Sequence, residues 1–469
     1  MPVCTGYLCG LRISPRGMSD EHKGHGVDSS GSASTPLDRR GFLAAASTGA
    51  TAAVAGCSGI GGGGGDTIKI GGVYLLSGVA QALGTASANA AEVAVEQINE
   101  EGGIMGQDVE IEVRDHGDNP QAQVRSLAQE YGADVMIGIT SSGVTLASAP
   151  TIESLGIPFT ITDTGTPFIT EPDTETYGNY YESDSGKAAF TSNMFRTNAN
   201  TSHMTYGIAK FVQEEYGAMR VANLGPNYAY GQQCWDYFKA YSEGLGVDHE
   251  YVASEYPELE AGDMTPQINS VLDADPDLVF TSFWAGDATT FISQATEQGL
   301  FEQVEDVFDT IGADPTVYKA LGDTTPEGIH MSGWYWPTAY DNEHNQAFLD
   351  AYREEYQDDD TTPNIPGFTG GSTWASIFMY KKAIEAAGST NADDIISELE
   401  GITIDDDPRG PTTIQPDTHQ ANAPTVLGET SFDADVPYDG AGLVDTRTYT
   451  LTRSESKELL DGSGLGPGI

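Results

Sequence analysis

Apolar residues follow two different periods along most of this chain. The stretch Ile68–Pro120 begins with a run rich in apolar residues, which predicts a β-strand ending at a Ser-Gly turn. A helix is predicted next, because Ala91, Val95 and Ile98 are spaced i, i+4 and i+7. After a Gly-Gly break, residues 109–113 alternate apolar and charged side chains. A strand, a helix and a second strand in this order predict a parallel sheet with crossover helices.

The same alternation continues beyond this first unit. Further strands are predicted at 135–139, 157–161, 221–224, 278–283 and 307–311. Two polar loops, 140–143 and 162–167, follow consecutive strands of the first half. Open α/β sheets bind ligands at the carboxyl ends of their strands, so these loops are the first place to expect a binding site.

Charge is the extreme property of the sequence. The 469 residues suffice for two domains, and the formal net charge is −49. Nucleic-acid binding is therefore excluded as a function, because it depends on Lys and Arg side chains that neutralise phosphates. Aromatic residues make up 9% of the chain, which argues against disorder. We expect a folded protein adapted to molar salt, where the Debye length is about 3 Å and self-repulsion is screened.

The first 57 residues have the features of an export leader. Arg39-Arg40 precedes a short, weakly hydrophobic alanine run, as in a twin-arginine signal, and Met18 is a second possible start. Val54 to Cys57 has the form of a lipobox, which would make Cys57 the site of lipid attachment. The alternative, a short core helix, is disfavoured by the Ala, Gly and Thr content. Residues 58–67 are Gly-rich and predicted to be a flexible tether.

The cysteines offer no disulfide framework to the body of the protein. Cys4 and Cys9 lie in the leader with Cys57, so only Cys234 remains, and we expect it to be a buried or half-buried thiol. The histidines are scattered without the spacing of metal ligands, and no nucleophile with a base is recognisable. No metal or cofactor is predicted. The acidic triplets 358–360 and 405–407 are predicted to be solvated loops.

The ordered motifs LLSG, QALG, AVEQINEEGGIMG and RDHGDNP resemble the first unit of the type I periplasmic binding proteins of ABC transporters. The similarity is to the leucine/isoleucine/valine-binding branch, of the halophilic archaeal type, and extends from Ile68 to Arg453. It implies an α/β fold of two Rossmann-like lobes, joined by a three-segment hinge with the ligand cleft between them. Expected boundaries are 68–197 plus 329–400 for lobe I, 198–328 plus 401–455 for lobe II, and 456–469 for a flexible tail.

The resemblance also implies which residues bind the ligand. A helix N-terminus with nearby hydroxyl groups can hold a carboxylate without a basic residue, which suits a chain so poor in cations. In this family the two loops after adjacent strands and an aromatic residue of the second lobe hold the ligand carboxylate. The corresponding positions are Ser141, Ser142, Thr164, Thr166, and Phe283 or Trp284. Ordinary helix capping and turn formation are the alternative roles for these residues.

Three more positions are implied in the same way. Asp314 corresponds to an acidic residue that pairs with the ligand ammonium group, although capping of the next helix is an equal alternative. Tyr230 matches a loop facing the cleft, with core packing as its alternative. Leu83 stands where relatives often carry an aromatic residue beside the ligand side chain.

Together these features predict the substrate-binding component of an ABC importer. Its ligand would be a branched-chain or other α-amino acid, with amides or urea-like solutes as the alternative. We expect a monomer at the outer face of the membrane, anchored through Cys57, that delivers its ligand to permease subunits. A ligand-sensing receptor domain is the rival from the binding class. A two-lobed hydrolase is the rival among enzymes, and no catalytic residue supports it.

Overall fold

The fold is described from a computed structural model. It describes residues 67–171, 173, 182–183, 186–187, 191–357 and 365–469. The leader, Cys57, the tether up to residue 66 and the acidic triplet 358–360 lie outside the described residues. The body from Gly64 to the end of the chain forms one compact unit.

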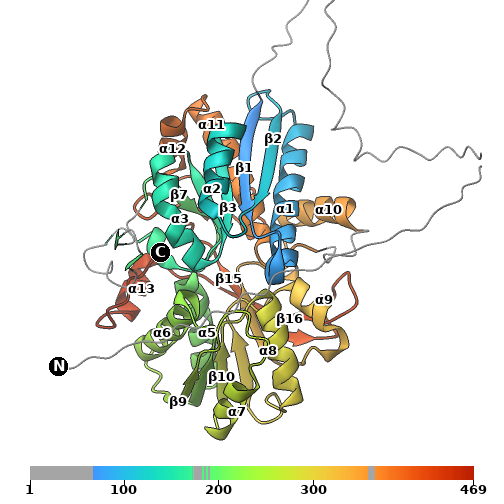
Figure 1. Ribbon diagram of the computed structural model, residues 1–469, viewed down its shortest axis with the longest axis vertical. Helices are drawn as coiled ribbons and strands as arrows, with labels where there is room; N and C mark the ends of the chain where they lie inside the picture. Colours follow the sequence, from blue (N-terminus) through green and yellow to red (C-terminus); the bar gives the residue numbers. More distant parts are fainter. Residues whose placement is uncertain (1–66, 172, 174–181, 184–185, 188–190, 358–364) are drawn as a thin grey trace, which may run out of the picture. The chain divides into compact units, whose positions relative to one another are not determined.

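A five-stranded parallel sheet forms the centre of the first lobe (Figure 1). Its spatial order is β2 (Val109–Asp115), β1 (Ile68–Tyr74), β3 (Val135–Thr140), β4 (Phe159–Asp163) and β7 (Met194–Arg196). The central strand β3 is buried along its whole length, as expected for a parallel sheet covered on both faces. The helices of this lobe are α1 (Gln81–Glu100), α2 (Pro120–Ser126), α3 (Ser142–Leu155), α10 (Glu343–Tyr356), α11 (Gly370–Ala387) and α12 (Ala392–Leu399).

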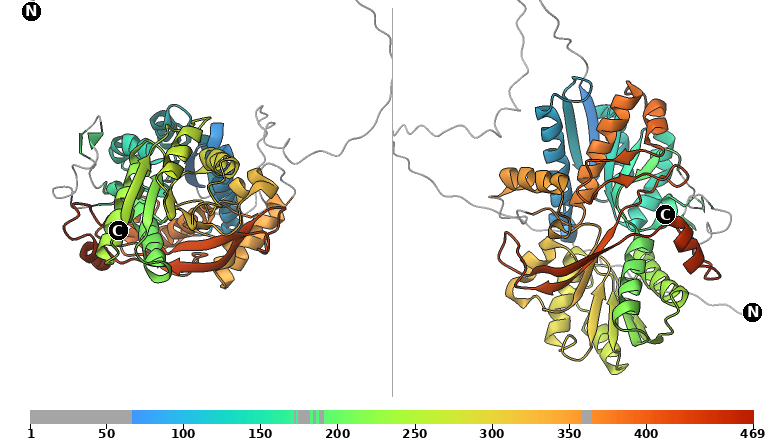
Figure 2. Two further views of the ribbon diagram at one scale, coloured as in Figure 1. Left: turned by 90° about the horizontal axis from the view of Figure 1, so that it is seen from below. Right: turned by 180° about the vertical axis from the view of Figure 1, so that it is seen from behind.

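The second lobe contains a seven-stranded mixed sheet. Its order is β16 (Gly442–Tyr449), β15 (Thr425–Ser431), β12 (His330–Gly333), β11 (Asp306–Asp309), β10 (Leu278–Thr281), β8 (Arg220–Leu224) and β9 (Glu250–Glu255). Strands β15 and β16 are antiparallel and extend one edge of the sheet (Figure 2). The helices are α5 (Thr201–Glu215), α6 (Ala229–Gly244), α7 (Thr265–Asp273), α8 (Ala285–Glu297), α9 (Pro315–Leu321) and α13 (Arg453–Leu459). Two-stranded pairs β5 (Glu182–Ser183) with β6 (Gly186–Lys187) and β13 (Thr403–Ile404) with β14 (Thr412–Thr413) complete the list.

The chain passes between the lobes three times, and two passages come later than predicted. The first follows β7, close to the expected boundary. The second cannot be at residue 329, because β12 pairs with β11 in the second sheet. The third is not at residue 401, since Ile404 and Ile414 belong to the apolar core of the first lobe. The chain enters the second sheet again only at β15.

The end of the chain is packed, which corrects the prediction of a flexible tail. Leu460, Leu465 and Ile469 are all buried. Asn200 at the first passage donates to the carbonyl oxygen of Gly468 at 2.7 Å. The last residues therefore cover part of the hinge.

One of the acidic residues predicted to be solvated is instead buried. Asp407 and Arg409 form a two-point ion pair (Nε–Oδ1 2.9 Å, Nη2–Oδ2 2.7 Å), and both side chains are inaccessible to solvent. Arg409 also donates to the carbonyl oxygen of Thr197 at 3.0 Å. This ion pair joins the segment before the third passage to the residue at the first one.

Among the described residues, no helix combines the length and apolar character needed to span a membrane.

We expect Asp407→Asn to lower the free energy of unfolding by about 3–5 kcal/mol, because it leaves a buried guanidinium without its counter-charge. Asp405→Asn is the matched control: Asp405 is mostly exposed and pairs only with Lys382 at the surface, so its loss should cost less than about 1 kcal/mol. Denaturant unfolding in concentrated salt measures both values. Equal effects of the two substitutions would contradict the role assigned to the buried ion pair.

Candidate functional site

A cavity between the two lobes contains about 300 Å³ of space not filled by atoms. Only about 20 Å³ of it can hold the centre of a water molecule, so the walls nearly fill the cavity and a ligand needs the lobes to move apart. The cavity is lined by Leu83, Thr140, Ser141, Ser142, Asp163, Gly165, Tyr228, Tyr230, Trp284, Ile311, Trp334 and Phe368. These residues come from strand ends, helix starts and loops of both lobes, so both lobes contribute walls.

The first lobe directs the N-terminus of α3 at this cavity. Ser141 precedes the helix with φ of 78° and makes no side-chain cap, and Ile139 has φ of 68°. Left-handed backbone at non-glycine residues is strained and is often found at binding sites. The Ser142 hydroxyl accepts a hydrogen bond from the Thr166 amide at 3.0 Å, which holds the two strand-end loops together. The first amide groups of α3 have no partner within the helix and can accept an anionic group.

The second lobe contributes a similar helix end. Trp284 precedes α8 without a side-chain cap, and its ring lines the cavity. At the mouth the lobes approach closely: a Cβ atom on Gly286 of α8 would lie 3.0 Å from that of Val79 in the first lobe. The cavity thus lies beside two helix N-termini, one from each lobe.

Two buried carboxyl groups face this region from opposite lobes. Asp163 at the end of β4 lines the cavity and accepts a hydrogen bond from the Thr140 hydroxyl at 2.7 Å. Burial raises its pKa to about 8, and the nearby Asp314 adds to the increase. None of the residues lining the cavity is Lys, Arg or His. The lining therefore contains no basic side chain that could pair with these carboxyl groups.

Asp314 performs the capping role that the sequence left open, and keeps one oxygen free. Its Oδ1 accepts from the amide and the hydroxyl of Thr316, both at 2.9 Å, at the start of α9. Its Oδ2 is buried without a hydrogen-bond partner. Burial raises the pKa of this carboxyl to about 6. Asp314 does not line the cavity; its Oδ1 and the side chain of the lining residue Leu83 both lie within 4 Å of a Cβ built on Gly367.

The remaining walls are aromatic rings whose polar atoms bond to the protein. Trp284 Nε1 donates to the Tyr228 hydroxyl at 3.1 Å, and the Tyr230 hydroxyl pairs with Thr310 at 2.8 Å. Trp334 Nε1 donates to the sulfur of Met204 at 2.8 Å, and the Trp334 ring packs edge-on against Phe368. Gly165 allows the close approach of Tyr230, since a Cβ there would lie 2.6 Å from the ring.

Of the residues predicted from the sequence, five line the cavity and four do not. The lining residues are Leu83, Ser141, Ser142, Tyr230 and Trp284. Thr164 turns its hydroxyl to Thr145 and to the carbonyl oxygen of Ile139, and Thr166 accepts from Gln233 of the second lobe. Phe283 packs against Phe291 in the second core, and Asp314 caps the start of α9.

Seven lining residues were not singled out from the sequence: Thr140, Asp163, Gly165, Tyr228, Ile311, Trp334 and Phe368. Asp163 lies within a loop that was predicted, but Asp-Thr-Gly is also a common turn sequence. Its position after a buried strand was the available signal. Trp334 and Phe368 come from segments at the second passage and before α11, which no local pattern connects to the cleft.

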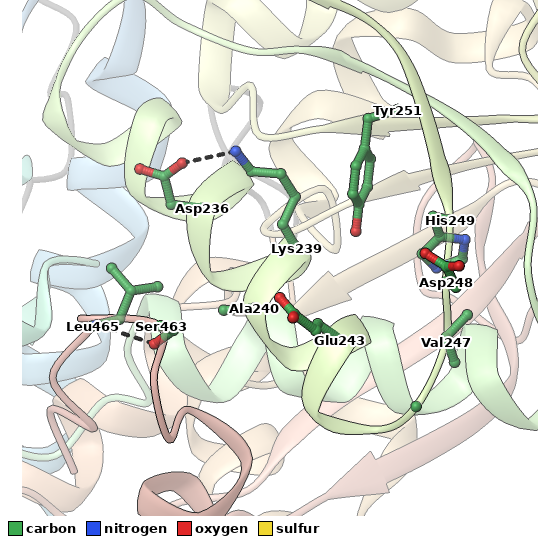
Figure 3. A pocket seen from close by; sticks show the side chains of 11 residues that line it. Asp236, Lys239, Ala240, Glu243, Val247, Asp248, His249, Tyr251, Ser463 and Leu465 are labelled. Atoms are coloured by element: carbon green, nitrogen blue, oxygen red, sulfur yellow. Dashed lines mark hydrogen bonds and ion pairs between the residues drawn. The ribbon is translucent and has the colours of Figure 1, made fainter.

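A wider hollow of about 1340 Å³ by the same measure lies on the surface of the second lobe. Figure 3 shows it beside α6, where Asp236 and Lys239 form an ion pair of 3.1 Å, and beside Ser463 and Leu465 of the tail. No residue of the first lobe that carries the predicted site lines it. Lobe closure would therefore not enclose a ligand there.

Within the described part of the chain, no set of three or more His, Cys, Asp or Glu side chains is placed to hold a metal ion. Cys234 is free and buried, and burial raises its pKa to about 12, which keeps the thiol protonated.

Comparisons with known proteins agree with this architecture. The profile of the family described as periplasmic binding protein matches residues 67–435. A Leu/Ile/Val-binding protein homolog 3 from Brucella melitensis is 26% identical over 328 residues, which cover 69% of this chain and 80% of that protein. A Leu/Ile/Val-binding protein homolog 8 from Brucella abortus is 23% identical over 364 residues, which cover 72% of this chain and 81% of that protein.

Solved structures show the same fold. An amino acid ABC transporter substrate-binding protein from Pseudomonas fluorescens superposes with a TM-score of 0.70 at 18% identity, covering 86% of this chain and 99% of that one. A solute-binding protein of an ABC transporter from Rhodopseudomonas palustris, in complex with 3,4-dihydroxybenzoic acid, superposes with a TM-score of 0.68 at 21% identity. The match covers 82% of this chain and 97% of that one.

The raised pKa of Asp163 predicts a pH dependence of stability without ligand. Its ordinary value is 3.8 in the unfolded chain, so between about pH 4 and pH 8 only the folded protein holds this proton. The stabilisation is complete below pH 3.8 and is lost as pH rises through 8. Asp314, Thr140, Tyr74 and Tyr228 are the neighbouring polar groups, and they are present in both proteins compared below.

Relative to Asp163→Asn, the wild-type free energy of unfolding should fall by about 1.4 kcal/mol per pH unit across this window. Urea unfolding at constant high salt measures the slopes. Asp118→Asn, at an exposed loop position, controls for the loss of one carboxyl group. Parallel slopes for wild type and Asp163→Asn would contradict the burial argument.

Proposed function

Because this chain belongs to the periplasmic binding protein family, we propose that it is the exported substrate-binding component of an ABC importer. Its solute would be a small zwitterion of the α-amino acid type, captured between the lobes and presented to a membrane permease. Amides and urea-like solutes form the second ligand class to test.

One observation carries the proposal: the cavity places groups for both ends of a zwitterion within walls drawn from both lobes. The open N-termini of α3 and α8 favour a carboxylate. Asp163, with Asp314 close enough to raise its pKa, favours an ammonium group. A chain with this net charge needs such an arrangement, because helix amides bind an anion without using a scarce basic residue.

Capture follows from contacts that form only when the lobes are closed. A ligand in the cavity touches Ser141 and Ser142 on one lobe and Trp284 on the other, so it stabilises the closed arrangement. Rotation about the three connecting passages would open the site. The closed form would be the one that the permease recognises.

We expect thermal unfolding in concentrated salt to shift upward with a subset of amino acids. The stabilisation is RT ln(1 + [L]/Kd), about 2.7 kcal/mol when the ligand is at one hundred times its dissociation constant. Trp284→Leu should abolish the shift, whereas Phe432→Leu, at an exposed aromatic residue, should preserve it. The proposal fails if neither amino acids, amides, urea compounds nor other small amines shift the transition.

We further propose that the protein is held at the outer face of the membrane through a lipid on Cys57, after export by the twin-arginine route. Cys57→Ser should move the protein from the membrane fraction to the soluble extracellular fraction. Arg39→Lys with Arg40→Lys should retain it in the cytoplasm with its leader uncleaved. Membrane association of the Cys57→Ser protein would exclude this anchor.

A further inference from the structure

The walls of the cavity combine five aromatic residues with one carboxyl group and the hydroxyl groups of Thr140, Ser141 and Ser142. Tyr228, Tyr230, Trp284, Trp334 and Phe368 supply five aromatic rings. The polar atoms of the two tyrosines and two tryptophans are bonded to protein groups at 2.8 to 3.1 Å. What these side chains present to a ligand is therefore π surface.

A cavity of this composition should bind primary ammonium groups and methylated ammonium groups with different affinities. A primary ammonium group has three N–H bonds, each of which needs an acceptor when it is buried. Asp163 is the one carboxyl group in the lining, and its Oδ2 already accepts from Thr140, which leaves Oδ1 for a ligand. An ammonium group whose hydrogens are replaced by methyl groups needs no acceptors. It gains from aromatic faces and from nearby negative charge.

Charge around the cavity favours a cation over a neutral group of the same shape. Asp163 lines the cavity, and Asp314 carries a buried Oδ2 with no partner. The buried guanidinium of Arg196 donates to the carbonyl oxygens of Thr164 and Thr166, and it is not among the residues that line the cavity. A cation inside would be enclosed by rings and would stabilise the ionised form of Asp163, which burial otherwise keeps protonated by raising its pKa to about 8.

We propose that this site selects N-methylated ammonium compounds, of the trimethylammonium type, within the solute-binding role proposed above. A carboxylate on the same ligand, as in an N-methylated amino acid, would lie at the N-terminus of α3. The inference rests on the proposed function and narrows its solute class.

Calorimetric titration of the purified protein in concentrated NaCl tests the inference. The methylated ligands are tetramethylammonium, choline and glycine betaine. The controls are 3,3-dimethylbutan-1-ol, which has the shape of choline without its charge, and leucine and glycine as primary amines. We expect at least one methylated cation to bind about tenfold or more tightly than both the neutral alcohol and the primary amines.

Variants separate the ring effect from the charge effect. Trp284→Phe keeps a ring and should weaken binding of the methylated cation less than Trp284→Leu, which keeps only bulk. Asp163→Asn should reduce the preference for choline over its neutral analogue. Circular dichroism establishes that each variant is folded, and Phe432→Leu is the surface control.

The outcomes distinguish the two levels of the proposal. Binding of leucine or another primary amine without binding of methylated cations overturns this inference and leaves the solute-binding role intact. Equal affinity for choline and the neutral alcohol also overturns it. If none of these compounds, nor any amide or urea, binds, the solute-binding role itself fails.

Discussion

A guanidinium group buried at the end of β7 determines the shape of the site. Arg196 is inaccessible to solvent and donates to the carbonyl oxygens of Thr164 and Thr166 at 3.2 and 2.7 Å. Burial without a carboxylate partner lowers its pKa to about 9. These two hydrogen bonds fix the loop that carries Asp163 and Gly165 at the point where the chain leaves the first lobe. Site geometry and hinge geometry therefore depend on the same side chain.

The carboxylates of this protein exist in two physical environments. Most are at the surface of a chain with net charge −49, where water and salt screen them. Asp163, Asp309 and Asp314 are instead buried, and burial raises the pKa of each. Asp309 is held by backbone amides such as that of Ile311 at 2.9 Å, so it supports the loop structurally. Asp163 and Asp314 have fewer internal donors, so a bound cation would stabilise their ionised forms.

How far the sequence predicts this protein depends on the range of the interactions involved. Periodicity located β1, α1 and the strand ends, because these depend on local spacing. The alternation of strands and helices then predicted the parallel sheet of the first lobe. The later passages were misplaced because β12 is assigned by pairing with distant strands, and the segment before β15 by packing into the core of the first lobe. The same limit applies to the cavity. Ser142 belongs to a helix start visible in the sequence, whereas Trp334 reaches the cleft only through tertiary packing.

The packed end of the chain adds a non-covalent link between parts that a hinge would move. Gly468 donates its amide to Glu171 at 2.8 Å in the first lobe, while Gly466 accepts from Tyr237 in the second. Arg453 of α13 pairs with Glu171 at 2.7 Å. A protein that binds only when closed loses affinity in proportion to the time it spends open. Because this segment is bonded to both lobes, changes in it would alter the balance between open and closed molecules, and so the apparent affinity, without touching the ligand.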